Sequence, residues 1–262
     1  MITAGVDIGS TASKSIILND GKILSAVIGP STTNPKKTAI DVFENATEDA
    51  GITRDKIDYI VGTGYGRAKV EFADENISEL SCHGKGAYFL LPTTRTVIDI
   101  GGQDTKVISI DEKGGLLEFG MNEKCAAGTG RFLDFIGRSM HIDVTELSKL
   151  HAESTGSVVL SNMCSVFIES EVINLINDGV SLPNIVRGLH QSVASRVASQ
   201  AKRIGVVPDV VITGGVAKNS GVVEELEEKL KLKLKRFPDN IDPQMIGAIG
   251  AAVLAKEKLA NK

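Results

Sequence analysis

A chain of 262 residues can form one large domain or two medium ones, and 42% hydrophobic with 24% charged residues is typical of a globular protein. The formal net charge of −4 provides no basic surface for nucleic acid or for an anionic membrane. No apolar run is long enough to cross a bilayer, and the N-terminus leads directly into a strand-like segment, so the sequence predicts a cytoplasmic protein with no nucleic-acid or membrane partner.

Strand and helix patterns follow one another through the first third of the chain. Runs rich in β-branched residues predict strands at 2–8, 14–18, 22–29 and 58–66. Apolar residues at helical spacing predict a helix over 36–50, and a second helix ends before Pro92.

The same pattern begins again after Pro92 and is followed by a longer helical region. Strands are predicted at 96–100, 104–110, 115–121 and 209–215, and helices at 129–140, 144–151, 165–178, 184–204, 218–230 and 244–258. The strict Lys–Leu alternation over 229–235 predicts an edge strand with its lysines outward. The order is therefore β-β-β-α-β-α twice, with a helical insertion in the second copy, which indicates an α/β fold of two similar lobes.

One strand–turn–strand device occurs twice in the chain. "VDIGSTASK" (6–14) and "IDIGGQDTK" (98–106) share Asp, Ile, Gly and Lys at the same spacing. Turns of small residues expose backbone N–H groups that form anion-binding nests, so two such hairpins facing each other would bind a polyphosphate from both sides. Two ordinary hairpins are the alternative, which the in-register repeat disfavours.

These turns provide the predicted nucleotide and magnesium site. We expect the phosphates to be bound by Gly9, Ser10, Thr11, Ala12, Ser13, Lys14, Gly101 and Gly102. Asp7 and Asp104 are predicted to hold Mg²⁺ through water. A buried strand that ends in Gly214 and Gly215 would let an adenosine ring approach the backbone, with Gln244 nearby. Lys14 as a solvated strand residue and Gln244 as a surface residue remain alternatives.

Three cysteines without a CxxC spacing do not form a disulfide framework. Cys125 and Cys164 each lie before a predicted helix, where the helix dipole favours a thiolate. Two thiolates are half of the four that a cubane iron–sulfur cluster needs, and a twofold dimer would supply the other half. Buried packing residues are the alternative for both, and Cys82 is interpreted as structural.

Several segments together carry a resemblance to a known family. With "GTGYGR", "DIGGQDTKV", "NEKCAAGTGRFL", "CSVFIESEVI" and "TGGVAKN", the chain resembles the activators of 2-hydroxyacyl-CoA dehydratases in the BadF/BadG/BcrA/BcrD ATPase family. This family lies within the superfamily of actin, sugar kinases and heat-shock chaperone ATPases. The resemblance implies a two-lobed actin-like ATPase fold of duplicated ribonuclease H-like lobes, with the nucleotide cleft between them. The first lobe would span 1–94, completed by a closing helix within 240–262, and the second would span 95–239.

The resemblance also implies a function. Members of this family are homodimeric, oxygen-sensitive ATPases that use ATP/ADP, Mg²⁺ and one 4Fe–4S cluster per homodimer to donate a low-potential electron. Carried onto this sequence, Cys125 and Cys164 would ligate the cluster, and a dehydratase or related reductase would receive the electron that a ferredoxin or flavodoxin supplies. We expect Gln103 and Asp104 to position the attacking water, with Asp7 on the metal side.

The sequence leaves open two alternatives from other functional classes. One is a cluster-free small-molecule or sugar kinase of the same superfamily, and the other is an ATP-dependent scaffold whose cysteines only pack. Only the electron donor needs both Cys125 and Cys164, so these two residues discriminate between the alternatives.

Overall fold

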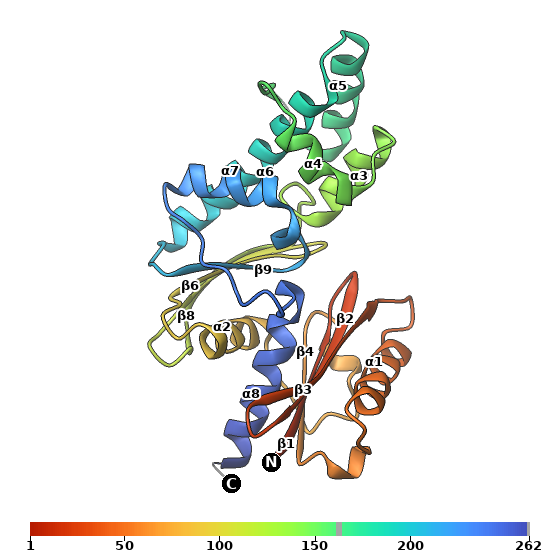
Figure 1. Cartoon of the computed structure of the whole chain (residues 1–262), viewed down its shortest axis with the longest axis vertical. Helices are drawn as coiled ribbons and strands as arrows, with labels where there is room; N and C mark the ends of the chain where they lie inside the picture. Colours follow the sequence, from red (N-terminus) through yellow and green to blue (C-terminus); the bar gives the residue numbers. More distant parts are fainter. Residues whose placement is uncertain (161–163, 261–262) are drawn as a thin grey trace.

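The computed structural model describes residues 1–160 and 164–260. The chain forms two lobes, each built on one β-sheet, which lie one above the other in Figure 1. None of the helices in these ranges is both long and apolar enough to cross a membrane.

The first sheet has five strands in the order β3-β2-β1-β4-β5. They are β1 (Ile2–Ile8), β2 (Ala12–Asn19), β3 (Lys22–Pro30), β4 (Tyr59–Thr63) and β5 (Glu75–Asn76). Helix α1 (Pro35–Asp49) covers one face, because its apolar stripe, including Val42 and Phe43, is buried against the sheet. Asn34 caps this helix by accepting from the Lys37 amide, and Pro35 occupies the first turn, where its missing N–H has no cost.

The second sheet repeats the same connectivity in the order β8-β7-β6-β9. Its strands are β6 (Thr96–Ile100), β7 (Thr105–Ile110), β8 (Leu116–Asn122) and β9 (Val210–Thr213). In each sheet the first strand pairs antiparallel with the second and parallel with the fourth. The predicted β-β-β-α-β-α duplication is therefore confirmed.

The helical insertion forms the far end of the second lobe (Figure 1). Its helices, with those that follow, are α3 (Gly130–Ser139), α4 (Leu147–Ala152), α5 (Ser165–Asn177), α6 (Leu182–Ile204) and α7 (Ser220–Leu230). The long helix α6 runs through the core of this lobe and buries Val186, Leu189 and Val193 there. Short 3₁₀ turns lie at Arg54–Lys56, Arg67–Lys69, Val144–Glu146, Gly215–Lys218 and Pro243–Met245.

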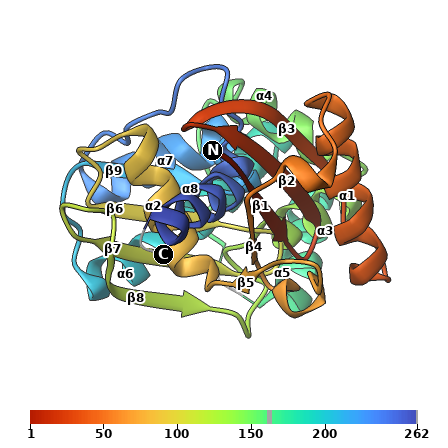
Figure 2. The ribbon, with the colours of Figure 1, turned by 90° about the horizontal axis from the view of Figure 1, so that it is seen from below.

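Two helices lie between the sheets, and each packs on the sheet that is farther from it in sequence (Figures 1 and 2). α2 (Glu79–Leu90) follows the first sheet, yet its Leu80 and Ala87 belong to one buried cluster with strands of the second. α8 (Ile246–Ala260) ends the chain and packs on β1 and β4 of the first sheet. The lobe boundaries at 94 and 239 therefore stay a prediction, since α2 precedes residue 95 but lies on the second sheet.

Glycines let α2 and α8 approach closely. A Cβ built on Gly250 would overlap the Cys82 carbonyl, and one on Gly86 would overlap the Ile246 carbonyl. Side chains at these two positions would force the helices apart, so the contact between them depends on glycine.

The edge strand predicted over 229–235 is wrong. Helix α7 continues to Leu230 and ends at Lys231 with a left-handed φ of 57°. Lys235 then makes a single bridge to Val211 beside β9. The Lys235 amide donates to the Val210 carbonyl at 2.8 Å, whereas the Leu234 amide, on the side away from β9, donates to the Glu227 carboxylate at 3.0 Å. The Lys–Leu alternation did not reveal that α7 continues to Leu230, and the chain after it forms an isolated bridge in place of a strand.

Candidate functional site

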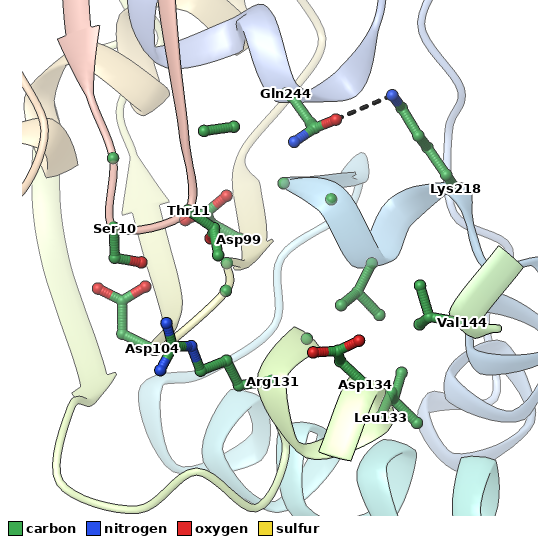
Figure 3. A pocket seen from close by; sticks show the side chains of 18 of the residues that line it. Ser10, Thr11, Asp99, Asp104, Arg131, Leu133, Asp134, Val144, Lys218 and Gln244 are labelled. Atoms are coloured by element: carbon green, nitrogen blue, oxygen red, sulfur yellow. Dashed lines mark hydrogen bonds between the residues drawn. The ribbon is translucent and has the colours of Figure 1, made fainter. Parts of the chain in front are cut away.

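A cavity of about 880 Å³ opens between the two β-hairpins and the turn after β9 (Figure 3). That volume is within the usual range for small-molecule sites. Most residues predicted to bind nucleotide or magnesium line it: Asp7, Gly9, Ser10, Thr11, Ala12, Lys14, Gly101, Gly102, Asp104, Gly214, Gly215 and Gln244. Ser13 is fully buried behind the hairpin, with its hydroxyl 2.8 Å from that of Ser31. Gln103 is exposed and is not among the lining residues, so its role stays a prediction.

The tips of the two hairpins touch. A Cβ built on Gly102 would overlap the hydroxyl of Thr11 on the opposite hairpin. The second hairpin is also fixed to the start of α3, because the carbonyls of Gly101 and Gly102 accept from the amides of Gly130 and Arg131, both at 2.9 Å. The second turn thus contacts the first lobe on one side and the helical insertion on the other.

Each hairpin places an aspartate opposite a lysine. Asp7 pairs in register with Lys14 across β1 and β2, and Lys14 Nζ donates to Asp7 Oδ2 at 3.1 Å. In the second sheet Asp99 pairs with Lys106, whose Nζ is 3.3 Å from Asp99 Oδ2. The repeated sequence therefore encodes a repeated ion pair at the base of each turn.

The second ion pair belongs to a larger buried network. Lys106 Nζ lies 2.8 Å from Asp104 Oδ1 and 3.6 Å from Glu79 Oε2. Burial alone would lower the pKa of Lys106, but its neighbouring carboxylates, Asp99 foremost, raise that pKa above its ordinary value.

The two carboxylates respond in opposite ways. Burial raises the pKa of Glu79 by more than Lys106 lowers it. Burial would also raise the pKa of Asp99, but His83, Lys106 and a hydrogen bond from Thr213 together hold it well below its usual range. Asp99 is therefore a fixed anion at this end of the cavity, while Glu79 binds a proton more readily than an exposed glutamate.

His83 reaches the site from α2. Its Nδ1 lies 3.2 Å from the Thr213 hydroxyl and 3.6 Å from Asp99 Oδ1. On its other side, a Cβ built on Gly247 would lie 2.9 Å from His83 Nε2 and 3.0 Å from Asp7 Oδ2. The imidazole thus stands between the buried carboxylates of the two hairpins.

Sequence reasoning missed several lining residues. Asp99, Lys106, Glu79, His83 and Arg131 all line the cavity without having been assigned a role there. The repeat itself could have identified Asp99 and Lys106, which match Asp7 and Lys14. The sequence did not identify Glu79 and His83, because only the packing of α2 places them in the cavity wall.

The turn after β9 forms the opposite wall. Gly214 has φ 84° and donates its amide to the Pro243 carbonyl at 3.0 Å. Gln244 Oε1 accepts from Lys218 Nζ at 2.8 Å (Figure 3). Without side chains, Gly214 and Gly215 leave the backbone accessible to a flat ring. Arg67 is not among the lining residues and donates to the Gly64 carbonyl, whereas its neighbour Tyr65 does line the cavity.

The charges at the hairpin end of the cavity are compatible with a divalent cation. Four carboxylates, from Asp7, Glu79, Asp99 and Asp104, lie there with three cationic side chains, those of Lys14, Lys106 and Arg131 (Figure 3). Among residues 1–160 and 164–260, no three His, Cys, Asp or Glu side chains are grouped as direct ligands for one ion. Mg²⁺ usually keeps several waters and binds through one or two carboxylates and substrate phosphates, which is compatible with this arrangement.

The cysteines lie in three different environments. Cys82 is buried in α2, and burial raises the pKa of its thiol to about 12. Cys164 is exposed and directly precedes α5, as predicted. The predicted helix after Cys125 is present as α3, which begins at Gly130, but the half-buried Cys125 lies in the loop ahead of the first turn and not at the helix N-terminus. Its sulfur accepts from Arg196 Nη1 at 2.9 Å.

Apolar side chains are exposed on helix α5 and in the segment before it. On α5, Phe167 is 62% exposed, Ile173 43% and Ile176 37%. Val159, shortly before the helix, is 92% exposed. Residues 161–163 of the predicted cysteine segment lie outside the described residues. Phe167 is one turn from Cys164, so an exposed thiol and an exposed aromatic ring lie together at the start of α5, as on surfaces that contact another protein.

Comparison with known proteins finds relatives that match nearly the whole chain. The activator of lactoyl-CoA dehydratase from Anaerotignum propionicum is 47% identical over 266 residues, covering 100% of both chains. The 2-hydroxyisocaproyl-CoA dehydratase activator from Clostridioides difficile is 48% identical over 259 residues, covering 97% of this chain and 95% of that protein.

Solved structures share the fold of this chain. Component A of (R)-2-hydroxyglutaryl-CoA dehydratase from Acidaminococcus fermentans superposes with a TM-score of 0.93 at 45% identity, covering 99% of both chains. A ROK hexokinase from Thermus thermophilus, with a TM-score of 0.53 at 15% identity over 100% of both chains, shares the fold alone. The predicted actin-like and sugar-kinase-like architecture is thereby confirmed. Since residues 4–255 match the model of the BadF/BadG/BcrA/BcrD ATPase family, the chain belongs to that family.

Proposed function

We propose that this protein is an ATP-hydrolysing electron donor that activates a 2-hydroxyacyl-CoA dehydratase or a related CoA-ester reductase. The observation that carries the proposal is similarity over nearly the whole chain to three proteins named as dehydratase activators, at 47%, 48% and 48% identity. A 33% identical relative named as a benzoyl-CoA reductase subunit supports the wider class of partner.

ATP binds in the cavity between the lobes. The backbone of both hairpin turns holds its phosphates, and Gly214, Gly215 and Gln244 hold its adenosine. Asp7 and Asp104 would hold Mg²⁺ through water, and four carboxylates against three cationic side chains at this end of the cavity support a cation there. Phosphoryl transfer to water depends on orientation of the nucleophile, a role for which we propose Gln103 and Asp104. Of these two, only Asp104 lines the cavity.

Cys125 and Cys164 would each provide one thiolate ligand to a 4Fe–4S cluster. Such clusters use four thiolates, so two copies of the chain would share one cluster, which would supply a one-electron redox centre when bound. The exposure of Cys164 and of the nearby Phe167 supports a homodimer that meets at the start of α5. The donor set fits the group, because Cys164 is accessible and the Cys125 sulfur has a cationic hydrogen-bond donor.

The contacts of the second hairpin couple nucleotide binding to this region. Its Gly101 and Gly102 carbonyls bond the first amides of α3, and Cys125 lies in the loop that leads into that helix. ATP and ADP differ in their contacts with the hairpins, and that difference biases closure of the lobes. A ferredoxin or flavodoxin supplies the electron, and ATP hydrolysis resets the protein after the partner has received it.

The proposal is tested by iron and sulfide analysis of protein purified without oxygen. We expect about four irons per dimer, with a charge-transfer absorption that bleaches on reduction. Cys125→Ala and Cys164→Ala should each lose the iron and retain nucleotide binding, whereas Cys82→Ala should keep both. A full cluster in Cys125→Ala or in Cys164→Ala would contradict the assignment of that cysteine as a ligand.

ATP-dependent reduction of a dehydratase by the loaded dimer is the functional test. The kinase alternative rests on fold similarity at 15% identity and has no observation of its own in its favour. An iron-free protein that cannot be reconstituted and that phosphorylates a sugar would replace this proposal with that alternative.

A further inference from the structure

Arg196 connects helix α6 to the loop that carries Cys125. Its Nη1 donates to Cys125 Sγ at 2.9 Å and lies 3.4 Å from the carbonyl oxygen of Ala127. Arg196 is half-buried, on the same helix as Val193 and Val197, which pack in the core of the second lobe. The guanidinium is therefore attached to a rigid element, and its position relative to the sulfur is set by the fold.

The loop is shaped around the Arg196 side chain. Gly128 has φ 92°, and a Cβ built there would lie 3.1 Å from Arg196 Cδ, so a side chain would press on the arginine stem. The Gly128 carbonyl in turn accepts from the Thr105 hydroxyl at 2.6 Å. One turn further along α6, Gln200 Nε2 donates to the Gly120 carbonyl at 2.7 Å. Polar side chains of α6 thus hold both the cysteine loop and the strand before it.

We propose that Arg196 is a positioning residue for the Cys125 sulfur and that it places one fixed positive charge per subunit beside the shared iron–sulfur cluster. This inference rests on the function proposed above. One-electron reduction adds one negative charge to the cluster. A cationic hydrogen-bond donor on a ligand sulfur stabilises the reduced form more than the oxidised form, so Arg196 raises the reduction potential and makes the cluster easier to reduce.

Arginine is suited to this role in a way that lysine is not. Both contacts come from one guanidinium nitrogen, Nη1, whose two N–H groups have fixed directions in the guanidinium plane. Lysine would keep the charge but lose the geometry. The two effects can therefore be separated by substitution.

The test compares three variants of the full-length dimer purified without oxygen. Arg196→Gln removes the charge, Arg196→Lys keeps it, and Arg203→Gln removes a matched arginine that is exposed in the last turn of the same helix. The readouts are iron per dimer and the midpoint potential of the one-electron couple, followed by electron paramagnetic resonance while titanium(III) citrate supplies the electron.

We expect a lower midpoint potential in Arg196→Gln, a smaller shift in Arg196→Lys and none in Arg203→Gln. Loss of iron from Arg196→Gln with intact nucleotide binding would also support the positioning role, provided that Arg203→Gln keeps its iron. Equal potentials and equal iron in all three variants would overturn the inference but leave the proposed function standing. Absence of iron from the unsubstituted protein would instead overturn the proposed function, and this inference with it.

Discussion

Lys106 lies directly across the β6–β7 pair from Asp99, with its Nζ 3.3 Å from the carboxylate. Their side chains are only 3% and 5% exposed. Asp7 and Lys14 repeat the relationship in the first sheet at 3.1 Å. Each hairpin thus pairs its own buried aspartate with a lysine of the same hairpin.

Lys106→Met should destabilise the protein strongly. The substitution leaves Asp99 buried without its lysine and removes the same cation from Asp104 and Glu79. Removing one partner of a buried ion pair costs about 3–5 kcal/mol, so we expect the free energy of unfolding in urea to fall by that amount. Lys37→Met is the control, because Lys37 pairs with Asp41 on the exposed face of α1. A surface change of this kind costs about 0.5 kcal/mol or less, and equal losses in both variants would contradict the argument.

Gly102→Ala should impair ATP hydrolysis by separating the hairpin tips. The added methyl group would overlap Thr11, and displacement of catalytic groups by about 1 Å can cost roughly 100-fold in rate. The measurement is the steady-state rate of phosphate release.

A second substitution tests whether this steric overlap is the cause. Adding Thr11→Gly removes the opposing side chain, so the double variant should recover much of the rate that Gly102→Ala loses. Thr11→Gly alone serves as the control for any other effect of that position. Strictly additive losses would show that the two turns act independently.

His190 should make stability depend on pH. Burial, with a smaller contribution from His151, lowers the pKa of His190 to about 3. Asn219 Nδ2 lies 3.1 Å from its Nε2, and His151 Nδ1 lies 3.1 Å from its Nδ1, so the folded protein holds the ring neutral. Below about pH 6.5 the unfolded chain binds a proton that the folded chain does not.

The sign of the effect follows from this difference in bound protons. Stability should fall as the pH drops from about 6.5 towards 3, by up to about 1.4 kcal/mol per pH unit for one histidine. Urea unfolding at pH 7.5 and 5.5 measures the change, and His190→Gln should flatten it. His141→Asn is the control, because His141 is exposed with φ 58°, a conformation that asparagine tolerates. An equal flattening in the control would exclude His190 as the source.

The three thiols should differ in reactivity in the cluster-free protein. Cys164 is exposed, whereas burial raises the pKa of the Cys82 thiol to about 12. With iodoacetamide at pH 8, we expect mass spectrometry to find Cys164 alkylated first and Cys82 modified only after unfolding in urea. Modification of native Cys82 as fast as Cys164 would contradict the buried environment.

The sequence predicted those parts of the fold that repeat or that depend on local patterns. The Asp-Ile-Gly and Lys skeleton identified both hairpins, and strands and helices followed from hydrophobic spacing. The Lys–Leu alternation at 229–235 gave a wrong strand, because helix α7 continues to Leu230 and the chain then turns at Lys231. A local pattern of this kind does not show where the preceding helix ends.

The site was predicted mainly where its residues belong to glycine-containing turns that the sequence reveals. The turn residues Gly9, Thr11 and Gly102 were found in this way, and they line the cavity. Glu79 and His83 come from α2, and Arg196 reaches Cys125 from α6 across 71 positions of the chain. These contacts depend on how helices pack, which residue spacing along one segment does not encode.

The exchanged positions of α2 and α8 have a consequence for synthesis of the protein. Ile16 and Leu18 are among the first residues to leave the ribosome, yet they are buried against Ile246, Ile249 and their neighbours, which are among the last. A nascent chain therefore carries an uncovered apolar sheet face during most of its translation. A transcript that stops before codon 246 yields a first lobe whose face is never covered, so such fragments should be captured by chaperones or degraded.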